Sequence, residues 1–380
     1  MSILDIDTVA LVRDESGEEA IRIIDQTKLP AETVMLDLKT GKEIWDAIYL
    51  LQVRGAPAIG VAAGFGIYLL TSRFVPPLPD TAENFAMNRE AMAKEFSENK
   101  DYLDSSRPTA VNLSWALKRM EGVFNAFVPE DNTEKPVAAL KERLRIAAEL
   151  IRAEDIEVSR RIGENGLSLL KPGDGILTHC NAGQLATIRY GTATAPIYLG
   201  QERGYGFHVY SDETRPLLQG ARLTSYELKS AGVDVTLICD NMSATVMRQG
   251  KVQAVIVGCD RVASNGDAAN KIGTSMAALA ARRYHIPFYV AAPTSTIDMS
   301  LSSGAEIVIE ERKPEEITEM WYAKRMAPEG VKVFNPAFDV TDSDLITGII
   351  TEYGVARAPY TESLKAIFEE KAVHPVTVKL

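Results

Sequence analysis

Three short segments carry residue types that could do chemistry. Residues 54–60 read Arg-Gly-Ala-Pro-Ala-Ile-Gly, residues 178–183 read Thr-His-Cys-Asn-Ala-Gly, and residues 258–261 read Gly-Cys-Asp-Arg. In the first segment a glycine stands ahead of a proline, which suits the start of a helix, and small side chains there leave backbone N–H groups open to an anion. The other two place a thiol and a carboxylate where hydrophobic runs end. A phosphate holder beside an acid–base pair predicts chemistry on a small phosphorylated metabolite.

Cys180 closes the hydrophobic run that begins at residue 175. Residues 184–193 are compatible with a helix, so the thiol is expected near a helix N-terminus, where its pKa would fall and it could serve as a base or nucleophile. The alternative is a small buried side chain of the core. His179 should point to the opposite face of the strand, and we expect it to be structural.

Asp260 follows the apolar run 254–258. A carboxylate at the mouth of such a strand is a candidate for a raised pKa, as a general acid needs. Arg261 would oppose that shift if the two side chains met. The alternatives for Asp260 are helix capping or a structural ion pair. Cys239 and Cys259 are expected to be core residues.

Two further polar segments could contact a ligand. Residues 265–274 form a turn-rich stretch predicted to be a loop that runs into a helix, in which Asn270 could hold sugar hydroxyls and Lys271 a phosphate. Residues 212–216 end another predicted strand, and Gln219 lies where the next helix opens. Capping or interface chemistry is the alternative for both. The spacing of a P-loop is absent. The dinucleotide fingerprint is absent as well, which disfavours nicotinamide chemistry.

The elements that must position these residues fall into two predicted domains, as expected for 380 residues. The linker is placed at residues 127–136, which gives domains 1–130 and 131–380. In the first, residues 21–38 predict an antiparallel pair of strands. Helices are predicted at 42–53, 57–72 and around 113–124, with a partly helical excursion over 74–104. Beyond the linker, residues 140–151 predict a long amphipathic helix.

From residue 175 onward, short hydrophobic runs alternate with stretches compatible with helices. The predicted strands are 175–180, 207–210, 235–239, 254–258, 288–292 and 331–334. This alternation is typical of an α/β fold with a mostly parallel, Rossmann-like sheet covered on both faces. Because ligands bind at the carboxyl ends of such strands, Cys180, Asp212, Asp240, Asp260 and Pro293 are expected at one edge.

Composition excludes several classes of partner. A net charge of −11 argues against nonspecific binding to nucleic acid or to acidic membranes. Three cysteines without metal-ligand spacing fit a reduced compartment, and the first residues lack a secretory pattern, so a cytoplasmic location is expected. The uncharged run 55–72 is rich in glycine and alanine and predicts a tightly packed internal helix rather than a membrane span.

Taken together, these motifs resemble the methylthioribose-1-phosphate isomerase family, which shares its fold with regulatory subunits of the translation-initiation guanine-exchange factor. The resemblance covers nearly the whole chain. It is carried by residues 24–30, 54–60, 106–109, 178–183, 212–223, 258–274 and 292–296.

The resemblance implies roles for particular residues. Cys180 and Asp260 would be the catalytic pair. The substrate contacts would be Arg54, Gly55, Ala56, Arg107, Gln219, Asn270 and Lys271. It also implies a smaller N-terminal domain of helices and a short antiparallel sheet, a Rossmann-like catalytic domain, a homodimer, and no metal or organic cofactor.

The reaction implied converts 5-methylthioribose 1-phosphate, or a close 5-deoxyribose 1-phosphate analogue, into the ketose 1-phosphate. That chemistry would serve methionine salvage or the disposal of 5-deoxyribose. One alternative is a ribose-1,5-bisphosphate isomerase, which would need a second cationic cluster. Another is a non-catalytic regulatory subunit of the translation-factor type, which could dispense with Cys180 and Asp260.

Overall fold

The computed structural model describes residues 2–14, 16–108 and 110–379, and these form two compact units. The N-terminal unit contains residues 6–157, 185–189 and 377–379. The C-terminal unit contains residues 2–5, 158–184 and 190–376. The chain passes between them within one long helix, α5 (Pro136–Leu167), whereas the sequence predicted a boundary in the loop before it. Domain limits at residue 130 stay a prediction.

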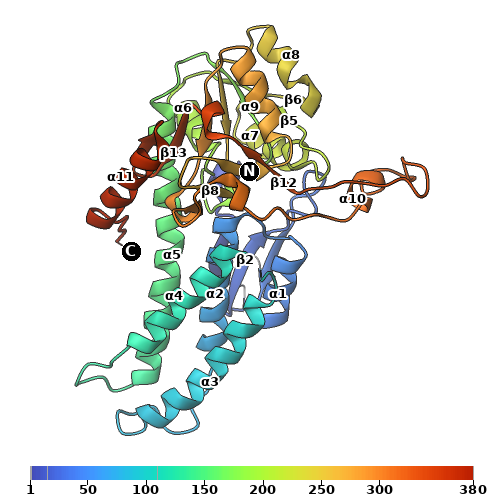
Figure 1. The fold of residues 1–380 in the computed structure, drawn as a ribbon. Helices are drawn as coiled ribbons and strands as arrows, with labels where there is room; N and C mark the ends of the chain where they lie inside the picture. Colours follow the sequence, from blue (N-terminus) through green and yellow to red (C-terminus); the bar gives the residue numbers. More distant parts are fainter. Residues whose placement is uncertain (1, 15, 109, 380) are drawn as a thin grey trace. The chain divides into compact units, whose positions relative to one another are not determined.

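The N-terminal unit combines a small antiparallel sheet with helices (Figure 1). Its strands are β1 (Val9–Arg13), β2 (Glu19–Ile24) and β3 (Met35–Leu38), in the order β1-β2-β3. Its helices are α1 (Gly41–Tyr49), α2 (Ala56–Ser72), α3 (Phe85–Asp104), α4 (Val111–Ala126) and the first part of α5. The predicted strand pair is confirmed as β2 and β3, in register from Ile21 opposite Leu38.

Helix α2 is the centre of this unit, as its glycine-rich sequence predicted. Every residue from Ala58 to Leu69 is buried. A side chain on Gly60 would meet the Asn112 carbonyl oxygen at 3.2 Å, so glycine lets α4 approach closely. The described residues contain no helix with both the length and the apolar character needed to cross a bilayer.

The C-terminal unit is built on a seven-stranded sheet of order β14-β13-β10-β7-β4-β5-β6, in which only β14 runs antiparallel to its neighbour. Its strands are β4 (Gly175–Thr178), β5 (His208–Asp212), β6 (Asp234–Ile238), β7 (Ala254–Val257), β10 (Phe288–Ala291), β13 (Gly348–Thr351) and β14 (Gly354–Ala356). The helices of the unit are α6 (Ala195–Glu202), α7 (Ser225–Ser230), α8 (Ser243–Arg248), α9 (Thr274–Arg283), α10 (Glu315–Thr318) and α11 (Tyr360–Val373).

Both faces of this sheet are buried, which confirms the predicted α/β class. Leu177, Val255 and Val257 belong to one hydrophobic cluster, whereas their neighbours Ile176, Ala254 and Ile256 belong to another. Strands covered on both faces read as continuous apolar runs, because no position has to face water. This explains why residues 254–258 show no alternation.

A second, four-stranded sheet, of order β11-β8-β9-β12, was not predicted. It contains β8 (Arg261–Ala263), β9 (Ala268–Lys271), β11 (Ile297–Asp298) and β12 (Phe338–Thr341). The predicted loop over 265–274 was therefore partly wrong, because Asn270 and Lys271 lie on β9. The strand predicted at 331–334 was also wrong. That segment is irregular, and the strand forms further on, at β12.

Asp155, on α5 in the N-terminal unit, gives stability a dependence on pH. It accepts the backbone N–H of Ile188 at 2.7 Å, and burial raises its pKa to about 7 from an ordinary 3.8. The folded protein therefore binds this proton more tightly than the unfolded chain does. Its contribution to stability is present at pH 4 and is lost as the pH rises through about 7.

We therefore expect Asp155→Asn, whose amide oxygen can still accept the Ile188 N–H, to gain stability relative to wild type as the pH rises. Between pH 5 and pH 8 the difference in unfolding free energy should shift by about 2 kcal/mol in favour of the variant. Urea unfolding at both pH values measures this, with Asp131→Asn on an exposed loop as the control. A difference that does not vary with pH would contradict the assignment.

Candidate active site

Cys180 lies two residues beyond the end of β4 with its backbone in an unusual conformation. Its φ is +66°, in the left-handed region that residues with a side chain rarely adopt. Two threonines hold it there. The Thr214 hydroxyl accepts the Cys180 N–H at 2.8 Å, and the Thr224 hydroxyl donates to the Cys180 carbonyl at 2.6 Å. Left-handed non-glycine residues cluster at functional sites, where the surrounding structure enforces them.

The residues after Cys180 are fixed by a buried acid. Glu227 is fully buried, and its Oε1 accepts the Asn181 amide at 3.0 Å. A side chain on Gly183 would lie 1.2 Å from the same oxygen, so glycine is required there. The predicted helix over 184–193 was wrong: a single 3-10 turn forms at Gln184–Ala186, and α6 begins only at Ala195. The thiol is thus held by a loop and not by the start of a helix.

Asp260 is brought to the same edge of the sheet by β7, the strand next to β4. A side chain on Gly258 would meet the Ala182 Cβ at 2.4 Å, so this glycine lets the end of β7 lie directly against the loop that follows Cys180. The Asp260 N–H donates to the Ala269 carbonyl at 2.9 Å, at the base of the β8–β9 hairpin. Arg261 pairs instead with Asp298, at 3.7 Å. The Asp260 side chain is exposed.

The hairpin brings the next two predicted residues beside Asp260. Asn270 is buried, and its amide donates to the Thr274 hydroxyl at 3.0 Å. Lys271 is 8% exposed, with its Nζ 4.2 Å from the centroid of the Phe338 ring. Within the described part of the chain no carboxylate forms an ion pair with Lys271. A buried ammonium that rests on an aromatic face is suited to binding an anion.

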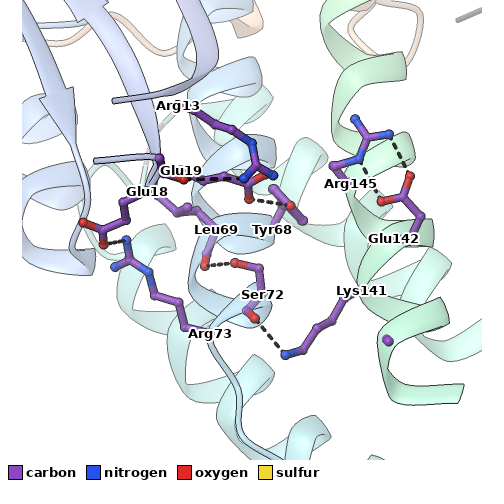
Figure 2. Close-up of a pocket in the computed structure, with 12 residues that line it drawn as sticks. Arg13, Glu18, Glu19, Tyr68, Leu69, Ser72, Arg73, Lys141, Glu142 and Arg145 are labelled. Atoms are coloured by element: carbon purple, nitrogen blue, oxygen red, sulfur yellow. Dashed lines mark hydrogen bonds and ion pairs between the residues drawn. The ribbon is translucent and has the colours of Figure 1, made fainter. Parts of the chain in front are cut away.

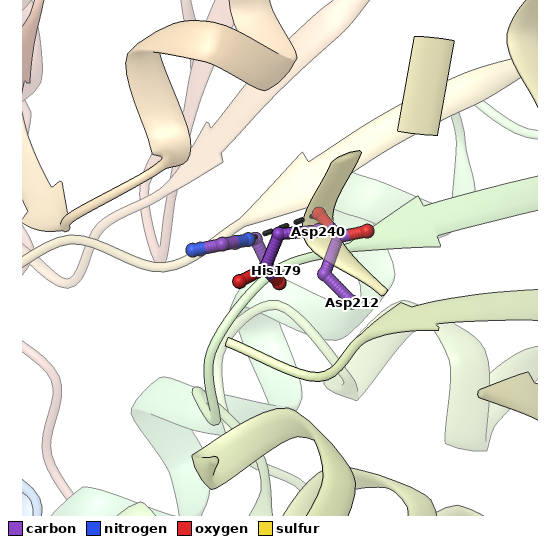
Figure 3. A group of neighbouring side chains, drawn as sticks. All are labelled: His179, Asp212 and Asp240. Atoms are coloured by element: carbon purple, nitrogen blue, oxygen red, sulfur yellow. Dashed lines mark hydrogen bonds and ion pairs between the residues drawn. The ribbon is translucent and has the colours of Figure 1, made fainter. Parts of the chain in front are cut away.

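His179 connects the end of β4 to the end of β5 and to the segment before α9, and Figure 3 shows it with Asp212 and Asp240. Its Nδ1 lies 2.9 Å from Asp212 Oδ2, at the end of β5, and its Nε2 lies 2.9 Å from the Ile272 carbonyl oxygen. Burial alone would lower the pKa of His179, but the Asp212 carboxylate favours the charged ring, and the pKa lies above its usual value. Nε2 faces a carbonyl oxygen and therefore carries a hydrogen, and the raised pKa favours a ring that donates at Nδ1 as well. These hydrogen bonds explain the structural role that the sequence predicted for His179.

His179, Asp212 and Asp240 also have ligand atoms within 4.8 Å of one another, as a metal site would. They do not fit one. Nε2 of His179 must carry a hydrogen to meet a carbonyl, and Asp212 Oδ1 accepts from Ser243 at 2.7 Å. The Asp240 oxygens accept the N–H groups of Thr214 and Arg215, each at 2.7 Å. The three side chains hold neighbouring loops in place through these hydrogen bonds.

Gln219 lies where the segment after β5 enters a short π-helix, Gly220–Thr224. Its side chain is buried, and its Oε1 has no hydrogen-bond partner among the described residues. A buried carbonyl oxygen without a donor is costly unless a ligand supplies one. This observation supports the predicted role of Gln219 as a substrate contact.

The remaining predicted residues belong to the N-terminal unit. Gly55 is the N-cap of α2 with φ +90°, and a side chain on it would lie 2.4 Å from the Ala186 Cα. Arg54 is half-buried, and Ala56 is exposed at the first turn of α2, the helix whose start the motif predicted. Arg107 is half-buried ahead of α4, and Thr109 of the same motif lies outside the described residues.

Of the two cysteines expected to be core residues, Cys259 packs against a hydrophobic cluster of the C-terminal unit and Cys239 does not. Cys239 is exposed, so that prediction was wrong. Cys259 is half-buried, with Sγ 3.3 Å from the Thr296 hydroxyl, and burial raises its pKa to about 12. A thiol that resists ionisation in this way is unsuited to act as a base at neutral pH.

An open cavity of about 470 Å³ in the N-terminal unit contains none of the predicted site residues (Figure 2). Its charges already have partners: Arg145 with Glu142 at 2.7 Å, Arg73 with Glu18 at 2.9 Å, and Lys141 with the Ser72 carbonyl at 2.7 Å. We assign it no role at the site.

The sequence placed Thr214 in the polar segment 212–216 without a role for it, and it gave no sign of Thr224 or Glu227, because isolated polar residues carry no spacing signal. We expect Thr214→Val to lose about 1–3 kcal/mol of unfolding free energy, since the buried N–H of Cys180 would lose its acceptor. Thr214→Ser, which keeps the hydroxyl, should stay near wild type. Urea unfolding of the three proteins measures this. Equal stability of the valine and serine variants would contradict the assigned hydrogen bond.

The comparisons with known proteins agree with this geometry. The chain is 63% identical to a methylthioribose-1-phosphate isomerase of Symbiobacterium thermophilum, over 96% of this chain and 97% of that protein. It is 56% identical to a 5-deoxyribose 1-phosphate isomerase of Petrotoga mobilis, over 95% of this chain and 100% of that protein. The crystal structure of 5-methylthioribose 1-phosphate isomerase from Pyrococcus horikoshii superposes with a TM-score of 0.87 at 42% identity, covering 97% of both chains.

A family model described as the Initiation factor 2 subunit family matches residues 52–358. These findings confirm the resemblance and the fold predicted from the sequence motifs: the chain belongs to the Initiation factor 2 subunit family.

Proposed function

We propose that this protein is an aldose–ketose isomerase that converts 5-methylthioribose 1-phosphate or 5-deoxyribose 1-phosphate into the corresponding ketose 1-phosphate. The names of relatives at 63% and 56% identity support both substrates. The observation that carries the proposal is the linkage around His179. Hydrogen bonds and close backbone contacts join the segments of Cys180, Asp260, Asn270, Lys271 and Gln219 at one edge of the sheet.

The chemistry requires an acid because the phosphate blocks the anomeric oxygen, so the sugar ring cannot open as a free aldose does. We assign this role to Asp260. It would give a proton to the ring oxygen as the bond from C1 to that oxygen breaks, which leaves an electron-deficient C1 that still carries the phosphate. The carboxylate that remains can then accept a proton from a hydroxyl.

Two routes for the hydrogen on C2 use these residues. In one, the Cys180 thiolate removes it as a proton, an enol forms between C1 and C2, and a proton returns to C1. In the other, the hydrogen migrates from C2 to C1 as hydride while the C2 hydroxyl gives its proton to Asp260. Both end in a ketone at C2 and an intact 1-phosphate. Reaction in D₂O separates them, since only the first allows deuterium into C1.

Substrate binding is assigned to the other predicted residues. Arg54, Arg107 and Lys271 would carry the phosphate charge, with the backbone at Gly55 and Ala56 beside it. Asn270 and Gln219 would hold sugar hydroxyls. No metal or organic cofactor is needed in this scheme. We further propose a cytoplasmic homodimer, which gel filtration with light scattering tests.

The description of the family as initiation-factor subunits favours one second candidate, a binding subunit without catalysis. Such a subunit has no need for a thiol held at φ +66° by two threonines. Retention of this conformation beside Asp260 favours the enzyme.

We expect Cys180→Ser and Asp260→Asn each to lower kcat by at least about 100-fold, because each removes a group that moves a proton. Cys239→Ser and Asp131→Asn, both at exposed positions, are the matched controls and should retain wild-type rates. Ketose 1-phosphate formation measures turnover, and circular dichroism verifies folding. Wild-type rates in either folded site variant would refute the assigned catalytic pair.

A further inference from the structure

A narrow arm, residues 312–335, extends from the C-terminal unit around α10 (Figure 1). Its base is closed by the Arg312 N–H, which donates to the Asn335 carbonyl at 2.9 Å, and by a β-bridge between Glu311 and Pro336. The arm carries an unusual number of large apolar side chains that are exposed: Met320, Trp321, Tyr322, Met326, Val331 and Phe334.

Two of these aromatic residues are anchored to the segment that follows β5. The Trp321 indole N–H donates to the Pro216 carbonyl at 2.7 Å, and the Arg222 guanidinium lies 4.8 Å from the centroid of the Trp321 rings. Arg215 donates to the Ile317 carbonyl at 2.9 Å and lies 5.6 Å from the Tyr322 ring centroid. Hydrogen bonds and cation–π contacts thus join the arm to residues 215–222 at several points.

The anchored segment is also the one that shapes the site. Thr214 and Leu218 both have positive φ, +64° and +56°, which non-glycine residues adopt only when the surroundings enforce it. On one side the Asp240 carboxylate accepts the Thr214 and Arg215 N–H groups. The arm contacts the same turn from Ile317 and Trp321, at Arg215, Pro216 and Arg222. The strained turn leads directly into Gln219, whose buried Oε1 has no hydrogen-bond partner among residues 2–14, 16–108 and 110–379.

We infer that Trp321 is a positioning residue for the isomerase reaction: through Pro216 and Arg222 it holds the turn that aims Gln219 at the substrate. The inference rests on the proposed function. The arm therefore contributes to substrate affinity without touching the substrate. The effect of the arm on substrate affinity is transmitted through the Gln219 side chain. A general effect on folding would not depend on Gln219.

A double-mutant cycle tests this. Trp321→Phe keeps an aromatic ring for Arg222 but loses the N–H to Pro216, and it should lower kcat/KM about five-fold, chiefly by raising KM. Gln219→Ala should lower kcat/KM by itself. In the double variant the loss should equal that of Gln219→Ala alone, because Trp321 acts through Gln219.

Trp115→Phe is the matched control, since Trp115 has the same kind of contact, with Arg119 at 5.5 Å, and no assigned role at the site. It should leave kcat/KM unchanged in both backgrounds. If Trp321→Phe fails to fold, Arg222→Gln, which removes the partner of the Trp321 ring, replaces it in the same double-mutant cycle.

Three results would overturn the inference: a Trp321→Phe variant with wild-type kcat/KM, losses that multiply in the double variant, or a Gln219→Ala variant with wild-type kcat/KM. A wild-type protein that turns over none of the sugar 1-phosphates would remove the proposed function itself and this inference with it. An active wild type with a failed cycle removes only the inference.

Discussion

The site depends on one backbone constraint, the left-handed conformation of Cys180. A parallel strand that ends in this way turns sharply, so the thiol is presented by a loop at the carboxyl edge of the sheet. The conformation persists because the hydroxyls of Thr214 and Thr224 bind the N–H and the carbonyl of the same residue. Two elements distant in sequence thereby fix the position of one reactive group. A change in the Cys180 backbone dihedrals would move the thiol even if the rest of the C-terminal unit kept its structure.

The buried charges around His179 extend this constraint to the other segments. The His179 ring, hydrogen-bonded to Asp212 and to the Ile272 carbonyl, ties the end of β5 and the segment between β9 and α9 to the end of β4. Buried polar groups require hydrogen-bond partners, and both ring nitrogens of His179 and both carboxylate oxygens of Asp212 have them. Asp240 continues the network to the Thr214 turn. Polar groups that could have formed a metal site serve as structural links between loops.

The sequence predicted the strands and helix starts that depend on local pattern. It did not predict the features that depend on tertiary contacts. Apolar runs identified the parallel strands through 288–292, and glycine ahead of proline identified the start of α2. The β8–β9 hairpin was read as a loop because Asn265, Gly266 and Asp267 form a turn whose flanking strands are short. Residues 331–334 are apolar, yet Phe334 is 77% exposed, so hydrophobicity there did not indicate a strand. Thr214 and Glu227 carry no spacing signal, and only the folded sheet brings Thr214 to Cys180 and Glu227 to Asn181.

Whether this site isomerises a sugar 1-phosphate is decided by a turnover assay with three substrates. Purified protein is assayed for ketose 1-phosphate formation from 5-methylthioribose 1-phosphate, 5-deoxyribose 1-phosphate and ribose 1,5-bisphosphate in parallel, with folding verified by circular dichroism. We expect turnover of one or both of the first two, with a kcat/KM well above that for the bisphosphate. Folded protein that turns over none of the three, or that prefers the bisphosphate, would contradict it.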